Sequence, residues 1–276
     1  MIDTLQNYVK NIGKLPTIPA IAHEILNLIG NDTVSINKIE GIVENDPAIS
    51  SKILSVANSA FFGIRQEVKT LDYAIMLIGF NNVKNIALGI SIMTVFGDSH
   101  DPGVLDYQKI YNHSVSVGFI AKRLSDELKL GIVDEIFLNG ILHDLGYLIL
   151  SRYFADNYRD VIHKLNNGET LLEAEKNVFG FDHADMGAWL AKKWQLPEHI
   201  KDTVQYHHSP SLTKNNLKHV SVTHIADYIS TKNLLSPLEK DPGYPLDPVA
   251  LEVLGIKDNE LNDIESRIVG YVNSNI

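Results

Sequence analysis

The chain has 276 residues, 45 % of them hydrophobic and 21 % charged, which is the composition of an ordinary globular protein with a sizeable core. Its formal net charge is −10, which repels phosphate backbones, so we expect no binding to DNA. It contains no cysteine, which excludes disulfides, thiolate catalysis, iron–sulfur clusters and cysteine-based zinc sites.

The N-terminal segment carries no sign of export. Residues 1–13 include Asp3 and several polar side chains, and they lack the apolar stretch of a signal peptide. No apolar run in the chain approaches the roughly 18–20 residues that a membrane span needs. The sequence therefore predicts a cytoplasmic protein with no membrane partner.

Several short helices are expected in the first 100 residues. Apolar residues recur with helical periodicity near residues 18–29, 34–43, 47–56, 71–78 and 83–96. Asp46 followed by Pro47 is typical of a helix start, because Asp caps the first turn and Pro fits the first helical position. Clear strand patterns are absent. We therefore predict an all-α fold in which residues 1–100 form an N-terminal helical subdomain.

The second part of the chain, residues 101–276, also reads as helical. Residues 97–102 (GDSHDP) form the clearest internal boundary. Helices are expected after it near residues 106–128, 133–150, 155–166, 170–178, 183–194, 198–208, 218–230 and 258–272. Residues 236–248 contain four prolines and predict an ordered, extended linker. This pattern predicts a helical bundle followed by a C-terminal helical extension.

The dipeptide His143-Asp144 is the main chemical signal. It lies in GILHDLGY, in the middle of the strongly apolar helix expected over 133–150. A His and the Asp next to it can converge on one ion, and a carboxylate can also bridge two ions. Imidazole nitrogen together with carboxylate oxygen suits Fe, Mn, Zn or Ni.

Other ligand-type side chains lie on apolar helix faces elsewhere in this part: His113, His183, His207, His208 and Asp227. Burying polar groups without partners costs on the order of 1–3 kcal/mol each, so metal binding or mutual hydrogen bonding would stabilise them. Ordinary roles stay open. His113 could be a satisfied core histidine, His183 could follow the helix cap Asp182, and the other three could face solvent.

Five further histidines, His23, His100, His163, His199 and His219, fit no such pattern, whereas His224 is a neighbour of the expected site. The aromatic residues Phe61, Phe62, Trp189 and Trp194 are interpreted as packing residues.

Several segments together resemble the HDOD domain family of bacterial signalling proteins. They are residues 14–19 (KLPTIP), 42–63 (IVENDPAISSKILSVANSAFFG), 71–80 (LDYAIMLIGF), 140–148 (GILHDLGYL) and 179–190 (FGFDHADMGAWL). The resemblance covers about residues 12–210 and is loose beyond them. HDOD domains are relatives of the HD and HD-GYP phosphohydrolases.

The resemblance implies an all-helical HD-like fold and a role in signal transduction beside two-component systems or cyclic di-GMP. By similarity with HD-GYP proteins, it also implies metal ligands at His113, His143, Asp144, His183, His207, His208 and Asp227, with Tyr147 and His224 next to them. The expected cofactor is a divalent transition metal, as one ion or a pair, of Fe, Mn, Ni or Zn. Signalling proteins are the expected partners, with a nucleotide as a candidate ligand.

Three departures from the HD-GYP pattern argue against hydrolysis. Tyr147 stands where HD-GYP enzymes have a lysine that would place a positive charge near a phosphate oxygen. Lys109 stands where some three-metal relatives have a glutamate. The Gly-Tyr-Pro signature is missing from its expected place, and we interpret residues 242–245 (PGYP) as a coincidental match.

Three functions follow as hypotheses. The favoured one is a regulatory module of the HDOD family that retains the metal site without hydrolytic activity, so no residue is assigned a catalytic role. The alternative is a metal-dependent phosphohydrolase or phosphodiesterase that acts on a nucleotide or cyclic dinucleotide, with Asp144 bridging two ions. The third is a variant of the first, a metal or redox sensor whose helix packing changes with occupancy.

Overall fold

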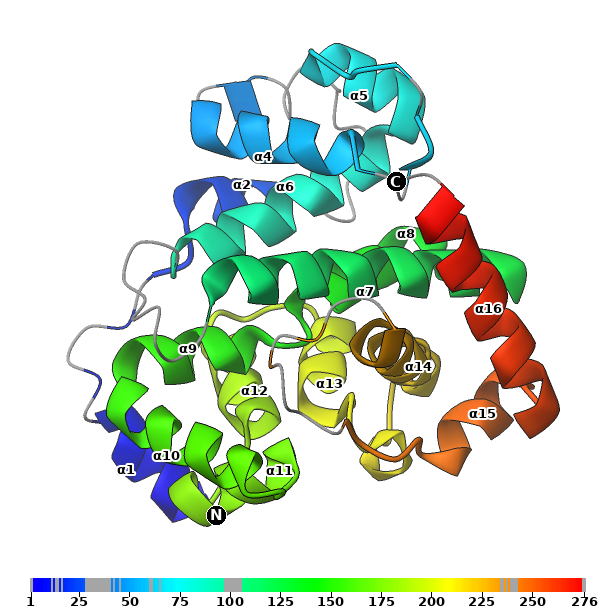
Figure 1. Cartoon of the computed structure of the whole chain (residues 1–276). Helices are drawn as coiled ribbons and strands as arrows, with labels where there is room; N and C mark the ends of the chain where they lie inside the picture. Colours follow the sequence, from blue (N-terminus) through cyan, green and yellow to red (C-terminus); the bar gives the residue numbers. More distant parts are fainter. Residues whose placement is uncertain are drawn as a thin grey trace.

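Every regular element described in the computed structural model is a helix, so the all-α prediction is confirmed (Figure 1). The described residues are 2–10, 12, 15, 17–27, 41, 43–44, 46–59, 62–64, 66–96, 106–233, 236, 238 and 243–274. Residues 34–40 of the second expected helix, and the boundary expected at 97–102, lie outside this part of the chain.

The helices fall into two sequence blocks. The first block contains α1 (Ile2–Lys10), α2 (Ala20–Asn27), α4 (Pro47–Ala57), α5 (Leu71–Ile78) and α6 (Phe80–Thr94). The second contains α7 (Tyr107–Glu127), α8 (Val133–Leu142), α9 (Leu145–Tyr153), α10 (Ala155–Asn166), α11 (Leu171–Phe179), α12 (His183–Lys193), α13 (Glu198–Tyr206), the short 3₁₀ helix η2 (Pro210–Leu212), α14 (Leu217–Asn233), α15 (Pro248–Leu254) and α16 (Asp258–Ser274).

Helix α4 begins where the sequence predicts. The Asp46 carboxylate accepts hydrogen bonds from the backbone N–H groups of Ala48 and Ile49, at 3.0 and 3.1 Å, and Pro47 occupies the first turn. These contacts satisfy two N–H groups that a helix start leaves without partners. The prediction of a capped helix start at this place is confirmed.

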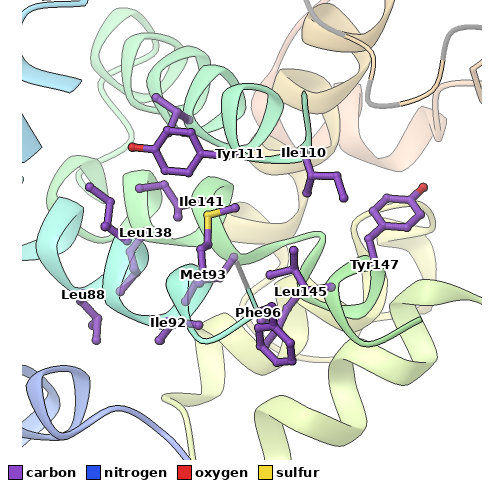
Figure 2. Packing of buried hydrophobic residues seen from close by; sticks show 14 of the residues in the cluster. Leu88, Ile92, Met93, Phe96, Ile110, Tyr111, Leu138, Ile141, Leu145 and Tyr147 are labelled. Carbon is purple, nitrogen blue, oxygen red and sulfur yellow. The ribbon is translucent and has the colours of Figure 1, made fainter. Parts of the chain in front are cut away.

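A large apolar core joins α6 to the helices of the second block. Leu88, Ile92 and Met93 of α6 belong to the same buried cluster as Leu138 and Ile141 of α8 (Figure 2). The cluster extends from Ile12 to Val204 and therefore links both sequence blocks. A division into subdomains near residue 100 stays a prediction.

A second buried cluster attaches the C-terminal helices. Ile120 and Leu124 of α7 pack with Ile225 and Ile229 of α14, and with residues of α15 and α16 that include Ile268. Helix α14 packs across α7, with α15 and α16 on its outer side (Figure 1). This packing places α14, which carries Asp227, against α7, which carries His113.

The expected helix over 133–150 is wrong in one respect, because it is two helices. Helix α8 ends at Leu142, α9 begins at Leu145, and His143 and Asp144 form the turn between them. Apolar residues continue through both helices, so periodicity alone does not reveal the break. The start of α9 lies so close to α12 that a Cβ atom on Gly146 would lie 1.8 Å from the backbone oxygen of His183.

The remaining predicted helices lie within a few residues of those observed, as is usual for helix ends. Two helices, α1 and α15, were not predicted. The second of these begins at Pro248 within the expected linker, with the Asp247 carboxylate as its cap. None of the described helices is both long and apolar enough to cross a membrane.

Candidate metal centre

The fold brings all seven expected ligand residues together. His113 comes from the middle of α7, and His143 and Asp144 come from the turn between α8 and α9. His183 is the first residue of α12, where Asp182 caps the helix as expected. The other three are His207 and His208, which follow α13, and Asp227, which lies on α14.

Asp144 lies at the centre of the cluster. Its Oδ2 atom is 3.1 Å from His143 Nε2 and 3.5 Å from His113 Nε2. The Oδ1 atom of Asp227 approaches the same two rings, at 3.1 Å from His113 Nε2 and 3.8 Å from His143 Nε2. We call His113, His143 and Asp227 the Asp227 side of the centre.

The other oxygen of Asp144 faces a second group of histidines. Asp144 Oδ1 is 3.4 Å from His183 Nε2 and 3.5 Å from His207 Nε2. His208 completes this group, with its Nε2 atom 2.9 Å from His183 Nε2. We call His183, His207 and His208 the histidine side. The two oxygens of one buried carboxylate therefore face different sets of imidazole nitrogens.

The outer nitrogens of the histidines orient the rings. His143 Nδ1 lies 2.7 Å from the backbone oxygen of Gly140, and His207 Nδ1 lies 3.0 Å from that of Val204. A carbonyl oxygen only accepts, so each Nδ1 carries the proton and donates it. In the neutral rings, the lone pairs of Nε2 then point toward Asp144, which is the tautomer that a metal ligand needs.

The residues present fit a metal ion. Within the described residues, His143 Nε2 is fully buried and makes no hydrogen bond, although it lies 3.1 Å from Asp144 Oδ2. A nitrogen lone pair and a carboxylate oxygen in such contact repel unless a proton or a cation lies between them. Three overlapping sets of side chains, all including or adjoining Asp144, have ligand atoms within 4.8 Å of one another.

The pKa values follow from burial and from the neighbouring charges. Burial by itself would lower the pKa of His143, but the carboxylates of Asp144 and Asp227 outweigh burial and raise it. Burial would raise the pKa of Asp144, yet His143 and its other histidine neighbours hold it well below its usual value. Protons and metal ions would compete for these nitrogens, so metal binding would release protons.

On the histidine side, burial dominates for two rings. It lowers the pKa of His207, and it lowers that of His208 well below the ordinary value, helped by the neighbouring imidazoles. His183 differs, because Glu175 and Asp144 outweigh burial and raise its pKa to about 9. Two of these three imidazoles are therefore neutral near pH 7.

Glu175 is a site residue that sequence reasoning missed. It is fully buried in α11, and its Oε2 atom accepts hydrogen bonds from His183 Nδ1 at 2.7 Å and from the His183 backbone N–H at 2.9 Å. Its other oxygen accepts from the Tyr158 hydroxyl at 2.9 Å. The sequence signal was its position on the apolar face of α11, next to Ala174.

The segment 243–245 (GYP), part of the match to the Gly-Tyr-Pro signature that we interpret as coincidental, lies at the candidate site. The Tyr244 hydroxyl donates to Asp227 Oδ2 at 2.6 Å. The three residues of the segment line a cavity of about 80 Å³ together with His113, Asp144, Tyr147, Thr170, Leu171, Leu172, His208, Asp227 and Thr231. The segment thus covers the site, although it lies far along the chain from the family's signature position.

The two expected neighbours of the site differ in role. The Tyr147 ring stacks on the His183 ring, with centroids 4.0 Å apart and an angle of 20° between the planes. His224 donates from Nδ1 to the backbone oxygen of His207 at 2.6 Å, and its Nε2 accepts from the Asp247 N–H at 2.9 Å. Both nitrogens of His224 are engaged, so it supports the histidine side from behind.

The comparisons with known proteins agree with this fold. A family model described as the HDOD domain matches residues 15–210. An uncharacterized protein of Treponema pallidum is 25 % identical over 211 residues, which cover 72 % of this chain and 38 % of that protein. The chain therefore spans less than two fifths of the length of this curated relative.

Three solved structures have a similar fold over nearly the whole of this chain. An HDOD domain protein of unknown function from Geobacter sulfurreducens has a TM-score of 0.81 at 22 % identity, covering 100 % of this chain and 98 % of its own. A proposed phosphohydrolase from Shewanella amazonensis scores 0.74 at 20 % identity, with 97 % and 96 % covered. A proposed signal transduction protein from Marinobacter aquaeolei scores 0.79 at 19 % identity, with 99 % and 64 % covered. At these identities the likeness is one of fold.

Proposed function

Because this chain belongs to the HDOD domain family, we propose that it is a bacterial signal-transduction module with a retained metal site and without hydrolytic activity. The observation that carries the proposal is a set of seven candidate ligands, all buried except the half-buried His208, beneath a cavity of only about 80 Å³. Pockets for small organic ligands typically measure about 300–1,000 Å³. The cavity is large enough for water or a small ion, and far too small for a nucleotide.

The proposed ligands divide between two ions of Fe, Mn, Ni or Zn. One ion would be held by His113, His143, Asp144 and Asp227, and the other by Asp144, His183, His207 and His208. Such a pair, when bound, supplies concentrated positive charge that can polarise an oxygen ligand. Asp144 is proposed as the shared ligand because its two oxygens face the two sides.

The lining of the cavity supports the regulatory role. Among the described residues that line it there is no lysine or arginine, so none of the described cations lies where a phosphate in the cavity would bind. Tyr147, which stands at the position of the HD-GYP lysine, is buried and stacked on His183. Phosphoryl transfer depends on positive groups placed against the developing charge.

A metal-dependent phosphohydrolase is the second candidate. It is favoured by the same arrangement of Asp144 between two ligand groups, because two ions held this way can clamp a phosphoryl group. The fold likeness to the proposed Shewanella amazonensis phosphohydrolase is consistent with it. A nucleotide or cyclic dinucleotide would be the substrate, and the segment 243–245 would have to move to admit it.

The first experiment measures metal content. Elemental analysis of tag-free protein is compared with a His143→Ala, Asp144→Ala double variant. We expect one to two equivalents of Fe, Mn, Ni or Zn in the wild type and their loss in the variant. Wild-type protein that stays metal-free after reconstitution with each of these ions would contradict the proposed site.

The second experiment separates the two candidates. Metal-loaded protein is assayed for hydrolysis of cyclic di-GMP and of bis-p-nitrophenyl phosphate, with the double variant as the background. We expect no turnover above this background. Turnover that depends on the bound metal would replace the regulatory proposal with the phosphohydrolase.

The partners proposed for the module are proteins of two-component or cyclic di-GMP pathways, with a nucleotide as a candidate ligand.

A further inference from the structure

Residues 243–247 reach the metal centre from outside the part of the chain that the family model matches, which ends at residue 210. We call these residues the strap. The strap follows α14, crosses the open side of the centre at Tyr244, and leads into α15. The residues of the strap therefore lie outside the matched region.

The Tyr244 hydroxyl lies between two acceptors. Asp227 Oδ2 is 2.6 Å from it, and the backbone oxygen of His224 is 3.0 Å from it. The hydroxyl carries one proton, so it donates to one acceptor at a time. The shorter contact is to the carboxylate, and hydrogen bonds to a charged acceptor are the stronger ones. Tyr244 therefore holds Asp227 by its Oδ2 atom.

The other oxygen of Asp227 is left facing the centre. Asp227 Oδ1 lies 3.1 Å from His113 Nε2 and accepts a hydrogen bond from the Thr231 hydroxyl at 3.1 Å. A carboxylate on a helix can otherwise rotate about its terminal bond, because that torsion has a broad preference. With Oδ2 tied to Tyr244, the rotation is restricted and Oδ1 is the oxygen presented to an ion.

The strap is anchored at its far end, so Tyr244 is placed before any ion binds. The Asp247 N–H donates to His224 Nε2 at 2.9 Å, and its carboxylate accepts from the Ser211 N–H at 2.8 Å and from the Val249 N–H at 3.0 Å. The Tyr244 ring also packs edge-on against His208, with centroids 4.5 Å apart. The ring contact places Tyr244 at the boundary of both sides of the centre.

We infer that Tyr244 is a positioning residue that fixes the Asp227 carboxylate, so that a single oxygen of Asp227 serves as a metal ligand on the Asp227 side. The inference rests on the proposed metal site. It assigns the strap a part in metal binding that the matched family region cannot supply, since both Tyr244 and Asp227 lie beyond residue 210.

The test is Tyr244→Phe, which keeps the ring against His208 and removes only the hydroxyl. The matched control is Tyr228→Phe, which removes a hydroxyl from the half-buried residue next to Asp227 on α14. Co²⁺ binding is measured by competition with a chelator, and the visible absorption of bound Co²⁺ reports its coordination. Melting of the metal-free proteins reports packing, and Asp144→Ala serves as the variant without a site.

We expect Tyr244→Phe to weaken one Co²⁺ binding step by about 10–100-fold, the usual cost of losing a partner of a metal ligand. The visible spectrum should change, because the released carboxylate can bind through both oxygens. The melting temperature without metal should stay close to that of Tyr228→Phe, and Tyr228→Phe should bind Co²⁺ like the wild type.

Two results would overturn the inference. One is wild-type affinity and spectrum in Tyr244→Phe. The other is a lowered melting temperature with unchanged affinity, which would make the hydroxyl a packing group. In both cases the proposed function stands if Asp144→Ala abolishes the Co²⁺ binding of the wild type. Wild-type protein that binds no Co²⁺ would instead contradict the proposed metal site itself.

Discussion

The two sides of the candidate metal centre present different chemistry to the same carboxylate. The Asp227 side pairs two histidines with a second carboxylate, and the negative charges raise the pKa of His143. The histidine side has three imidazoles and only the far oxygen of Asp144, and burial lowers the pKa of His207 and of His208. One side attracts cations by charge, whereas two of the three rings on the other side offer neutral nitrogen lone pairs.

This difference shows how one buried cluster can be stable before metal binds. Buried charges need partners, and the two carboxylates find them in the rings around them. The rings with fewer carboxylate neighbours stay neutral and avoid the cost of a buried charge. His183 is the exception, because Glu175 lies 2.7 Å from its Nδ1 atom and raises its pKa to about 9. Variants that affect one side alone test the comparison.

The largest effect is expected from Gly146→Ala. Its new Cβ would lie 1.8 Å from the His183 backbone oxygen and 2.9 Å from the Gly187 nitrogen, so α9 and α12 must separate. Overpacking typically costs about 1–3 kcal/mol, and a clash with backbone is expected at or above that range. Chemical denaturation should show this loss, and metal analysis should show weaker binding on the histidine side.

The matched control for that variant is Gly270→Ala in α16, where nothing lies within 4 Å of the added methyl group. Alanine has the higher helix propensity, so this change should stabilise the protein by up to about 1 kcal/mol. If Gly146→Ala were as stable as this control, the close approach of α9 to α12 would be wrong.

Asp227→Asn should have the next largest effect, confined to the Asp227 side. The change removes one negative charge that faces His113 and His143, while the histidine side keeps its ligands. One metal equivalent should be weakened by more than the roughly 10–100-fold typical of residues that only support a ligand. Isothermal titration with Zn²⁺ would resolve the two steps, and equal weakening of both would contradict the division into sides.

Glu175→Gln should weaken metal binding on the histidine side. The substitution keeps the shape but removes the charge that orients His183 through its Nδ1 atom. Loss of such a partner typically costs about 10–100-fold in metal affinity. The same titration measures it, and Glu252→Gln on the exposed surface of α15 is the control. Weakening of the step assigned to the Asp227 side, with the step assigned to the histidine side unchanged, would reverse the assignment of the two steps.

The smallest effect is expected from Lys232→Ala. Lys232 lies on α14, five residues after Asp227, and its ammonium group pairs with Glu265 of α16 at 3.0 Å. Nearly half of the lysine side chain is exposed, and such pairs contribute about 0–1 kcal/mol. Denaturation should show a loss within that range, with metal binding unchanged. A change in metal affinity would mean that α16 influences the Asp227 side.

Sequence patterns predicted which polar residues come together in the buried cluster, for a physical reason. His113 and Asp227 lie on helix faces that also carry large apolar residues, and a polar side chain on such a face is buried and needs a partner. Their partners could be expected among the few other residues with the same property. The structure brings these residues together, and their role in metal binding stays a proposal.

The same patterns did not identify Glu175 and Tyr244 as residues of the site. A glutamate in a helix ordinarily faces solvent, whereas this one is buried against Tyr158 of α10 and His183 of α12. Tyr244 is 17 residues from Asp227, in a proline-rich segment without helical periodicity, so no pattern sets the direction of its side chain. The break at His143-Asp144 was missed because apolar residues run through it.

The sequence by itself determined the helical class, the family and the seven candidate ligand residues, because periodicity and residue type are local properties that a chain carries before it folds. The tertiary structure alone decided how those ligands divide about the two oxygens of Asp144. It also decided that Glu175 and Tyr244 join them. Those outcomes depend on distances between helices far apart in the chain, such as the approach of α9 to α12 at Gly146, and packing sets such distances.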